Sequence, residues 1–197
     1  MNDLPARLLA ATALTASACA ADLQPEAEPD AGPGPGTPAG KVSTVRNPDG
    51  TYTTRVDATA MDGWTRVDVE TGVEPTDEAA WDFAARRFHI KLNGGASGSG
   101  GVEVVPVPGS LADVSAAPAG GWITDAPDGD DADAEPDYAF AQGDGWYAYD
   151  PTTHALSPRP LVWVMRTGDQ TTIKLVIEDY YDDAGTSGVF TLRWAPL

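Results

Sequence analysis

The sequence predicts an all-β domain, mainly antiparallel and sandwich-like or barrel-like, over residues 41–197. Short segments in which apolar and polar residues alternate recur along the chain, and this is the period of a half-buried strand. Turn signals rich in Gly, Pro, Asn and Asp separate these segments. The chain also holds 21 Gly, 17 Pro and 6 Trp. This composition suits strands and turns better than a helical bundle.

The first half of the domain contains several of the expected strands. Residues 51–57 have strand character, and residues 64–69 alternate cleanly. Residues 76–86 fit either a short helix with a Thr or Asp cap or an irregular strand, and the pattern does not choose between them. Residues 102–107 predict a further strand, in which Pro106 indicates a sheet edge or a strand end.

Residues 81–101 join a Trp-led apolar segment to an alternating strand and a run of glycines. Phe88, Ile90 and Leu92 fall on one face of this strand, and the Asn-Gly-Gly after it turns the chain. The glycine run lacks the Lys-Ser or Lys-Thr of a phosphate loop. It also lacks the glycine spacing of a nucleophile elbow. We therefore interpret this stretch as scaffold, and the sequence indicates no enzyme.

The C-terminal third predicts an antiparallel meander. Strands are expected near 145–149 and then at 161–166, 171–177 and 188–194, with Gly- and Asp-rich turns between the last three. The residues expected on the inward faces of the last two strands are Ile173, Leu175, Ile177, Phe190, Leu192 and Trp194.

The N-terminus predicts export. Residues 1–18 combine Arg7 with a short apolar run and small residues, which is typical of a signal peptide. The Ala-Ser-Ala-Cys that ends at Cys19 resembles a bacterial lipobox, so we expect this cysteine to be lipidated; plain secretion is the alternative. Residues 19–40 are rich in Ala, Pro, Gly, Asp and Glu and predict a disordered tether to a membrane surface.

Charge and cysteine content exclude several classes of function. The formal net charge is -18, and binding nucleic acid needs clustered Lys and Arg, so we expect no nucleic-acid partner. Cys19 is the single cysteine in the chain, which excludes an internal disulfide and a thiolate zinc cluster.

Few residues are candidates for binding a ligand. The two histidines are His89, on the polar face of its strand between two cations, and His154, in a loop near aromatic residues. Trp146 and Tyr149 near His154 would suit a flat apolar ligand, whereas His89 is more typical of an exposed strand residue. These observations make His154, Trp146 and Tyr149 the candidate ligand-binding set.

The acidic segment from Asp125 to Asp137 is a weaker candidate for a metal site. Its carboxylates Asp128, Asp130 and Asp133 could hold Ca²⁺, as in a calcium-dependent adhesion module, but the spacing does not match a calcium-binding loop. A solvated loop fits the pattern better, and we assign no metal.

The ordered motifs of the domain resemble the HmuY-like family of bacterial surface lipoproteins. The resemblance is carried by these segments: 81–84 and 87–88, 91–95 and 97–101, 145–146, 162–166, 173–177 and 180–181, and 188–192. It implies an all-β, fist-like domain. It also implies a haemophore that holds haem between two axial histidines and passes it to an outer-membrane receptor.

The chain departs from this family at both haem histidines. Asp130 follows the Pro-Asp-Gly that precedes the first, and Pro151 stands where the second is expected. His154 lies three residues further along. Axial ligation needs an imidazole aimed at the iron, so the sequence does not support bis-histidine binding.

The sequence therefore predicts a lipid-anchored, non-enzymatic protein at the bacterial outer membrane or cell surface. Haem or another porphyrin is the ligand that the resemblance implies, although no cofactor is required. The alternative is a structural or protein-interaction lipoprotein of the same fold that does not bind haem.

Overall fold

A computed structural model describes residues 40–77, 79–129 and 134–197. The predicted signal peptide, the predicted lipidation site Cys19 and nearly all of the predicted tether lie outside these residues. Within the described ranges, no helix is both long enough and apolar enough to cross a membrane.

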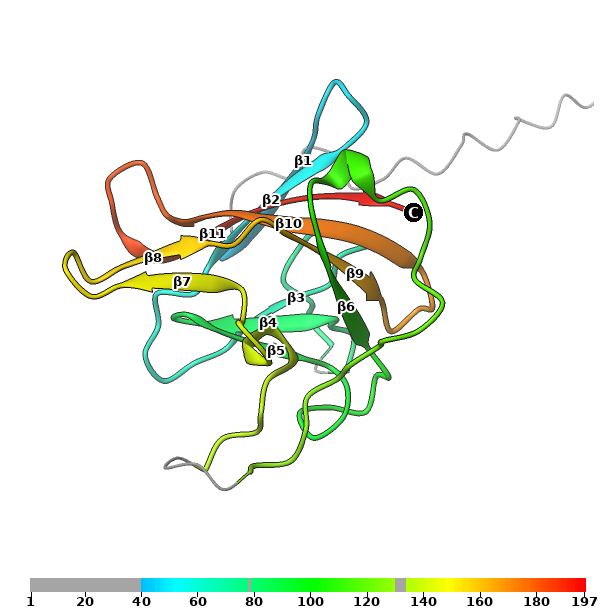
Figure 1. Cartoon of the computed structure of the whole chain (residues 1–197), viewed down its shortest axis with the longest axis horizontal. Coiled ribbons are helices and arrows are strands. Elements are labelled where there is room, and N and C mark those ends of the chain that lie inside the picture. The colour runs from blue at the N-terminus through cyan, green and yellow to red at the C-terminus, as the bar shows by residue number, and fades with distance from the viewer. Residues whose placement is uncertain (1–39, 78, 130–133) are drawn as a thin grey trace, which may run out of the picture. The chain divides into compact units, whose positions relative to one another are not determined.

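Antiparallel strands make up almost all of the regular structure, which confirms the predicted fold class (Figure 1). They form a six-stranded sheet, a three-stranded sheet and a two-stranded hairpin. The strands are β1 (Val42–Arg46), β2 (Tyr52–Asp57), β3 (Thr65–Val67), β4 (Phe83–Arg86), β5 (His89–Leu92), β6 (Glu103–Pro108), β7 (Tyr147–Asp150), β8 (Ala155–Pro158), β9 (Leu161–Arg166), β10 (Thr172–Tyr181) and β11 (Ser187–Pro196), and the short 3-10 helices are η1 (Leu111–Asp113) and η2 (Ala139–Ala141).

The large sheet has the strand order β1-β2-β11-β10-β9-β6. Strands β9, β10 and β11 pair as consecutive antiparallel neighbours, so the predicted C-terminal meander is confirmed. Strand β6 lies at one edge, where Pro106 fits because an edge strand pairs on one side only. The opposite edge, β1, was not predicted.

The main core lies between the large sheet and the small sheet β3-β4-β5. Every residue predicted to face inward from the last two strands is buried, which confirms the alternation. Fully burying one such side chain stabilises the fold by about 1.5–3 kcal/mol. The facing residues are Val67, Phe83, Ile90 and Leu92 from the small sheet, and Val56, Ile173, Leu175, Ile177, Phe190, Leu192 and Trp194 from the large sheet.

A second, smaller core covers the other face of β9. Val162 and Val164 are fully buried there beneath the segment that carries η1. Lys174 holds this segment in place, because its Nζ donates hydrogen bonds to the carbonyls of Leu111, at 2.8 Å, and Val114, at 2.6 Å. Burial on both faces explains why β9 is a continuous apolar run.

The structure shows which element residues 76–86 form and corrects the predicted position of Phe88. Of residues 76–86, the last four form β4, and no helix precedes them among the described residues. Phe88 does not share the buried face of Ile90 and Leu92, because it lies in the β4–β5 turn and is 40% exposed.

The glycine run wraps tightly around the side chain of Asn93. The Asn93 Nδ2 donates to the carbonyls of Ala79, at 3.1 Å, and Trp81, at 2.8 Å. Its Oδ1 accepts from the backbone N–H of Gly100 at 3.1 Å. A Cβ added to Gly98 would lie only 2.2 Å from the same oxygen. Close approach to Asn93, in addition to chain reversal, therefore explains the glycines.

Candidate functional site

The β7–β8 hairpin brings together two of the three predicted ligand-binding residues. Tyr149 lies on β7 opposite Leu156 of β8, and its hydroxyl is hydrogen-bonded to Nδ1 of His154. Tyr149 is 52% exposed, and His154 is exposed as well. The backbone N–H of Leu156 donates to the hydroxyl of Tyr181 at 2.9 Å, which fixes the hairpin beside β10 (Figure 1).

The loop between β7 and β8 holds His154 in a defined position. His154 has a φ of 58°, a left-handed conformation that histidine tolerates better than most residues. Its backbone N–H donates to the carbonyl of Asp150 at 2.8 Å. The Asp150 carboxylate accepts from the N–H of Thr152, at 2.7 Å, and from the hydroxyl of Thr153, at 2.8 Å. These hydrogen bonds hold the pKa of Asp150 below its ordinary value.

A series of ring contacts, which we call the aromatic row, links the hairpin to the small sheet. Tyr147 contacts Phe88 with ring centroids 6.1 Å apart, and Phe88 contacts His89 at 4.2 Å. His89 contacts Tyr138 at 5.8 Å, and Tyr138 contacts Trp64 at 5.7 Å. His89 is therefore half-buried among aromatic rings, in addition to lying on the polar face of its strand.

Tyr149 lies on the same side of the hairpin as Tyr147 of this row, whereas Trp146 is buried and contacts the Tyr147 ring with centroids 4.8 Å apart. Tyr147 and Tyr149 are two residues apart on β7 and so face the same side of the hairpin. Trp146 is only 2% exposed, packs against Phe190 in the core, and donates its Nε1–H to the carbonyl of Phe88 at 3.0 Å. We correct the predicted set accordingly: Trp146 is a core residue, because its ring is not accessible to a ligand.

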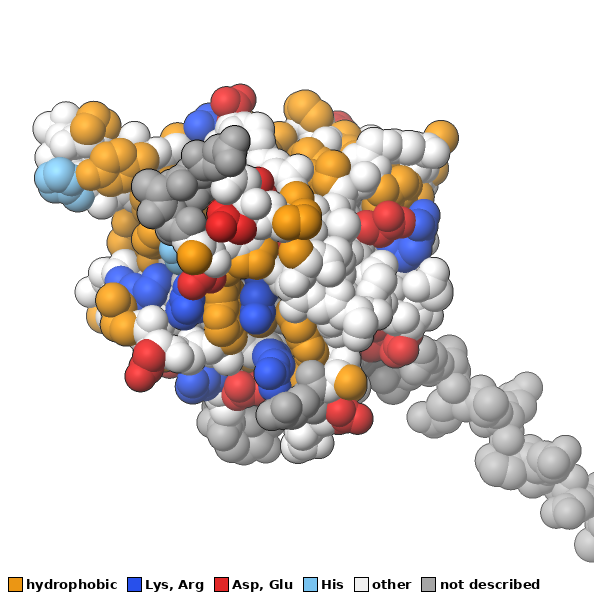
Figure 2. All heavy atoms as spheres, turned by 90° about the horizontal axis from the view of Figure 1, so that it is seen from below, with side chains coloured by type: hydrophobic (Ala, Val, Ile, Leu, Met, Phe, Trp, Pro, Cys, Tyr) orange, Lys and Arg blue, Asp and Glu red, His pale blue; other side chains and the backbone are white. Residues whose placement is uncertain are grey.

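A cationic patch, formed by Arg66, Arg86 and Lys91, lies on the outer face of the small sheet. The register places Arg66 and Lys91 on either side of Ala84, on neighbouring strands. The Arg86 guanidinium and the Lys91 ammonium each lie 4.5 Å from the ring centroid of Trp64. Figure 2 shows Lys and Arg side chains gathered beside exposed hydrophobic ones on this face of the molecule.

The patch concentrates positive charge in a chain whose formal net charge is -18. Burial and the neighbouring Arg66 lower the pKa of Lys91. Arg86 forms an ion pair with Glu135 at 3.0 Å, and the Arg66 side chain also interacts with other groups of the protein. Because clustered like charges create a strong local potential, this face is suited to an anionic group.

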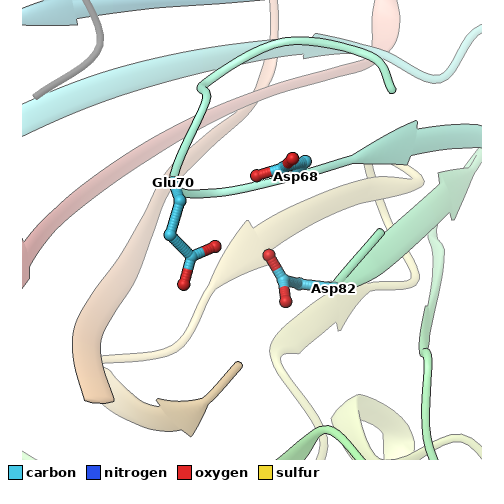
Figure 3. Close-up of side chains that lie close together, drawn as sticks. All are labelled: Asp68, Glu70 and Asp82. Carbon is cyan, nitrogen blue, oxygen red and sulfur yellow. The ribbon is translucent and has the colours of Figure 1, made fainter. Parts of the chain in front are cut away.

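A group of three carboxylates lies elsewhere, between the segment after β3 and the start of β4 (Figure 3). The ligand oxygens of Asp68, Glu70 and Asp82 all lie within 4.8 Å of one another. Asp82 is 4% exposed and accepts from the N–H groups of Val69 and Gly168, each at 2.9 Å. Burial raises the pKa of Asp82 to about 7, and Glu70 adds to this rise.

This carboxylate group borders a cavity of about 160 Å³ that Asp169 also lines. The spacing would allow a divalent cation. However, both Asp82 oxygens already accept backbone hydrogen bonds, and the raised pKa favours a proton shared with Glu70. Asp82 thus ties together two loops of the scaffold. The sequence contained no signal for this group, because acidic residues are common throughout the chain.

The acidic segment contains a buried carboxylate, contrary to the prediction of a solvated loop. Asp125 is 1% exposed, and its side chain accepts from the backbone N–H of Leu92 at 2.9 Å and from η2 at 2.8 Å. Burial raises its pKa. Of the metal candidates, Asp128 is exposed, and Asp130 and Asp133 lie outside the described residues.

The fold is an all-β domain whose small sheet carries the cationic patch beside the aromatic row, and Tyr138 of this row is buried. The family model described as HmuY protein matches residues 60–194, more than half of the chain. The chain therefore belongs to the HmuY family, and the resemblance inferred from its motifs is confirmed.

Solved structures share this fold. A protein from Bacteroides fragilis described as a lipoprotein is 21% identical, with a TM-score of 0.57 over 77% of this chain and 91% of its own. A protein from Bacteroides vulgatus described as an HmuY-like haem-binding protein is 19% identical, with a TM-score of 0.52 over 77% of this chain and 95% of its own. The apo HmuY analogue from Tannerella forsythia is 19% identical, with a TM-score of 0.54 over 77% and 95%. No curated protein sequence matches the chain.

Proposed function

We propose that this protein is an exported lipoprotein that binds haem at the bacterial outer membrane or cell surface and catalyses no reaction. Membership of the HmuY family supports haem as the ligand, since one structural relative is assigned as an HmuY-like haem-binding protein. The small residues before Cys19 and the tether-like segment after it support lipid anchoring. Transfer of haem to an outer-membrane receptor is the further step that the family resemblance implies.

The observation that carries the proposal is the aromatic row flanked by the cationic patch. A porphyrin is flat, apolar over its faces and anionic at its two carboxylates. Aromatic rings favour the faces of such a ligand, and fixed cations favour its carboxylates. Trp64 belongs to the aromatic row, and its ring also makes cation–π contacts with Arg86 and Lys91. The aromatic row and the cationic patch are therefore in contact.

Titration of the full chain with haemin, followed through the Soret band and through quenching of tryptophan fluorescence, tests this proposal. We expect saturable binding at micromolar haemin. We also expect weaker binding when Arg86 and Lys91 are both changed to Gln, because the charge is removed while the side chains keep much of their length. Arg55→Gln, on the large sheet, is the matched control. No saturable change with either readout would refute haem binding.

The alternative is a structural or protein-interaction lipoprotein of the same fold. Asp130 and Pro151 at the two histidine positions favour it, because neither side chain supplies an imidazole. Failure of haemin to bind, together with retention of the folded domain, would favour this alternative.

A further inference from the structure

The hydrogen-bonded pair of Tyr149 and His154 places a phenol next to a base, an arrangement that can bind a metal ion. We propose that Tyr149 is an axial ligand to ferric porphyrin iron and that His154 is the base that accepts its proton; this inference rests on the proposed haem-binding function. A tyrosine oxygen is an established axial ligand type for haem iron. The pair would take the place of an imidazole at the position where this chain has Pro151.

In this proposal the Tyr149 hydroxyl is the donor of the hydrogen bond to His154, which makes the phenolic oxygen the metal ligand of the pair. A neutral imidazole carries its proton on one nitrogen and accepts on the other. When the Tyr149 hydroxyl donates to Nδ1 of His154, the imidazole proton is on Nε2. In this tautomer neither imidazole nitrogen is free to bind a metal. The phenolic oxygen of Tyr149 is then the donor atom that the pair offers.

The proton and charge balance of the binding step is simple. The bond between iron and the Tyr149 oxygen forms as the phenolic O–H bond breaks, and the proton moves to Nδ1 of His154. The imidazole becomes an imidazolium that still donates to the bound oxygen, or it passes its Nε2 proton to solvent. The iron stays ferric, so no electron donor or acceptor is needed.

The backbone fixes both partners before any ligand arrives. Tyr149 lies on a paired strand, on the same side as Tyr147 and therefore as the aromatic row. The left-handed φ of His154 and the hydrogen bonds of Asp150 hold the loop, so the imidazole is positioned by the fold. Tyr149 is 52% exposed, which leaves its oxygen accessible to an iron atom.

The test compares haemin with metal-free protoporphyrin IX, using the full chain, Tyr149→Phe, His154→Gln and the matched control Tyr147→Phe. For haemin we expect a high-spin ferric spectrum with a phenolate-to-iron charge-transfer band and with phenolate modes in resonance Raman spectra. Tyr149→Phe should abolish both signals. His154→Gln should weaken haemin binding about 10- to 100-fold, the range usual when a group that supports a metal ligand is lost. Tyr147→Phe should retain the phenolate signals.

Metal-free protoporphyrin IX separates this inference from the proposed function. It has no iron to bind, so Tyr149→Phe and His154→Gln should lower its affinity much less than they lower the affinity for haemin. If neither porphyrin binds the unmodified chain, the proposed function is wrong. If haemin binds but Tyr149→Phe leaves the spectrum and affinity unchanged, the proposed haem-binding function still holds. In that case the iron ligand is another residue and the inference about Tyr149 is wrong. A low-spin spectrum that is lost in His154→Gln but kept in Tyr149→Phe would make His154 the ligand and would overturn the inference.

Discussion

The buried carboxylate Asp82 makes the stability of this protein depend on pH in a direction opposite to that of most carboxylates. Burial raises the pKa of Asp82 from its ordinary value of 3.8 to about 7, and repulsion from Glu70 contributes to the rise. The folded state therefore binds more protons than the unfolded state between these two values. Stability from this group is fully present below pH 3.8 and is lost as the pH rises to about 7.

The change Glu70→Gln isolates this effect. A rise in the pKa of Asp82 from 3.8 to about 7 corresponds to roughly 4 kcal/mol between acid and neutral pH. Burial is the larger cause and remains in the variant. Removal of the Glu70 charge should therefore restore only a part, on the order of 1 kcal/mol. The new amide can still accept from the hydroxyl of Thr167, which donates to Glu70 at 2.6 Å.

Urea unfolding at several pH values between 5 and 8 measures the prediction. We expect Glu70→Gln and the unmodified chain to have similar free energies of unfolding at pH 5, and the variant to become the more stable of the two as the pH rises to 8. Asp169→Asn, an exposed carboxylate at the same cavity, is the control and should show no such trend. If the difference between variant and unmodified chain does not change with pH, or changes in the opposite direction, Asp82 is not protonated in the folded state as argued.

Three further changes test other parts of the structure. Asn93→Ala removes three hydrogen bonds of a buried amide and should lower the free energy of unfolding by about 2–4 kcal/mol, measured by urea unfolding with Ser99→Ala as an exposed control. Lys174→Met should speed amide hydrogen exchange in residues 109–117 without a comparable change in β10, because the segment loses its two hydrogen bonds to Nζ. His154→Ala should weaken haemin binding more than His89→Ala; an equal or reversed order in fluorescence titrations would contradict the placement of the iron at the hairpin.

The sequence predicted those parts of the fold in which local pattern and tertiary packing agree. The strands of the meander alternate strictly, and their inward residues, such as Leu175 and Leu192, are buried as expected. Strands β1 and β8 were not predicted. Each has only five or four residues, and β8 contains Ser157 and ends at Pro158, so their pairing depends on neighbours that are distant in sequence or on the hairpin turn.

The site was predicted only in part, for a related reason. Tyr149 and His154 could be paired from sequence because they lie close together in one loop region. The aromatic row, in contrast, joins Trp64, Phe88 and Tyr138, which come from three separate segments. No periodicity within a single segment indicates such contacts, and they could be found only once the strands were placed in space.

Buried carboxylates were the least predictable feature, because their partners are backbone groups. Asp82 and Asp125 look in the sequence like the many exposed acidic residues of the chain, yet each accepts two backbone hydrogen bonds inside the protein. A carboxylate can satisfy two N–H donors that would otherwise be left without a partner, and this favours its retention in spite of the cost of burial. Acidic content alone therefore could not separate scaffold from surface.

This division of charge bears on how a family member without the expected histidines could still bind haem. Asp82 and Asp125 near the small sheet accept hydrogen bonds from backbone N–H groups. Arg86 and Lys91 lie half-buried against Trp64, and Glu135 is the acidic partner of Arg86. Porphyrin carboxylates would then meet cations, while the hairpin would supply the iron ligand. On our proposal, the loop need not shift to bring an imidazole to the position that Pro151 occupies. An anionic phenolate prefers ferric iron to ferrous iron, so reduction of the bound haem should weaken haem binding at this site. The same reduction should weaken binding less at a bis-histidine site.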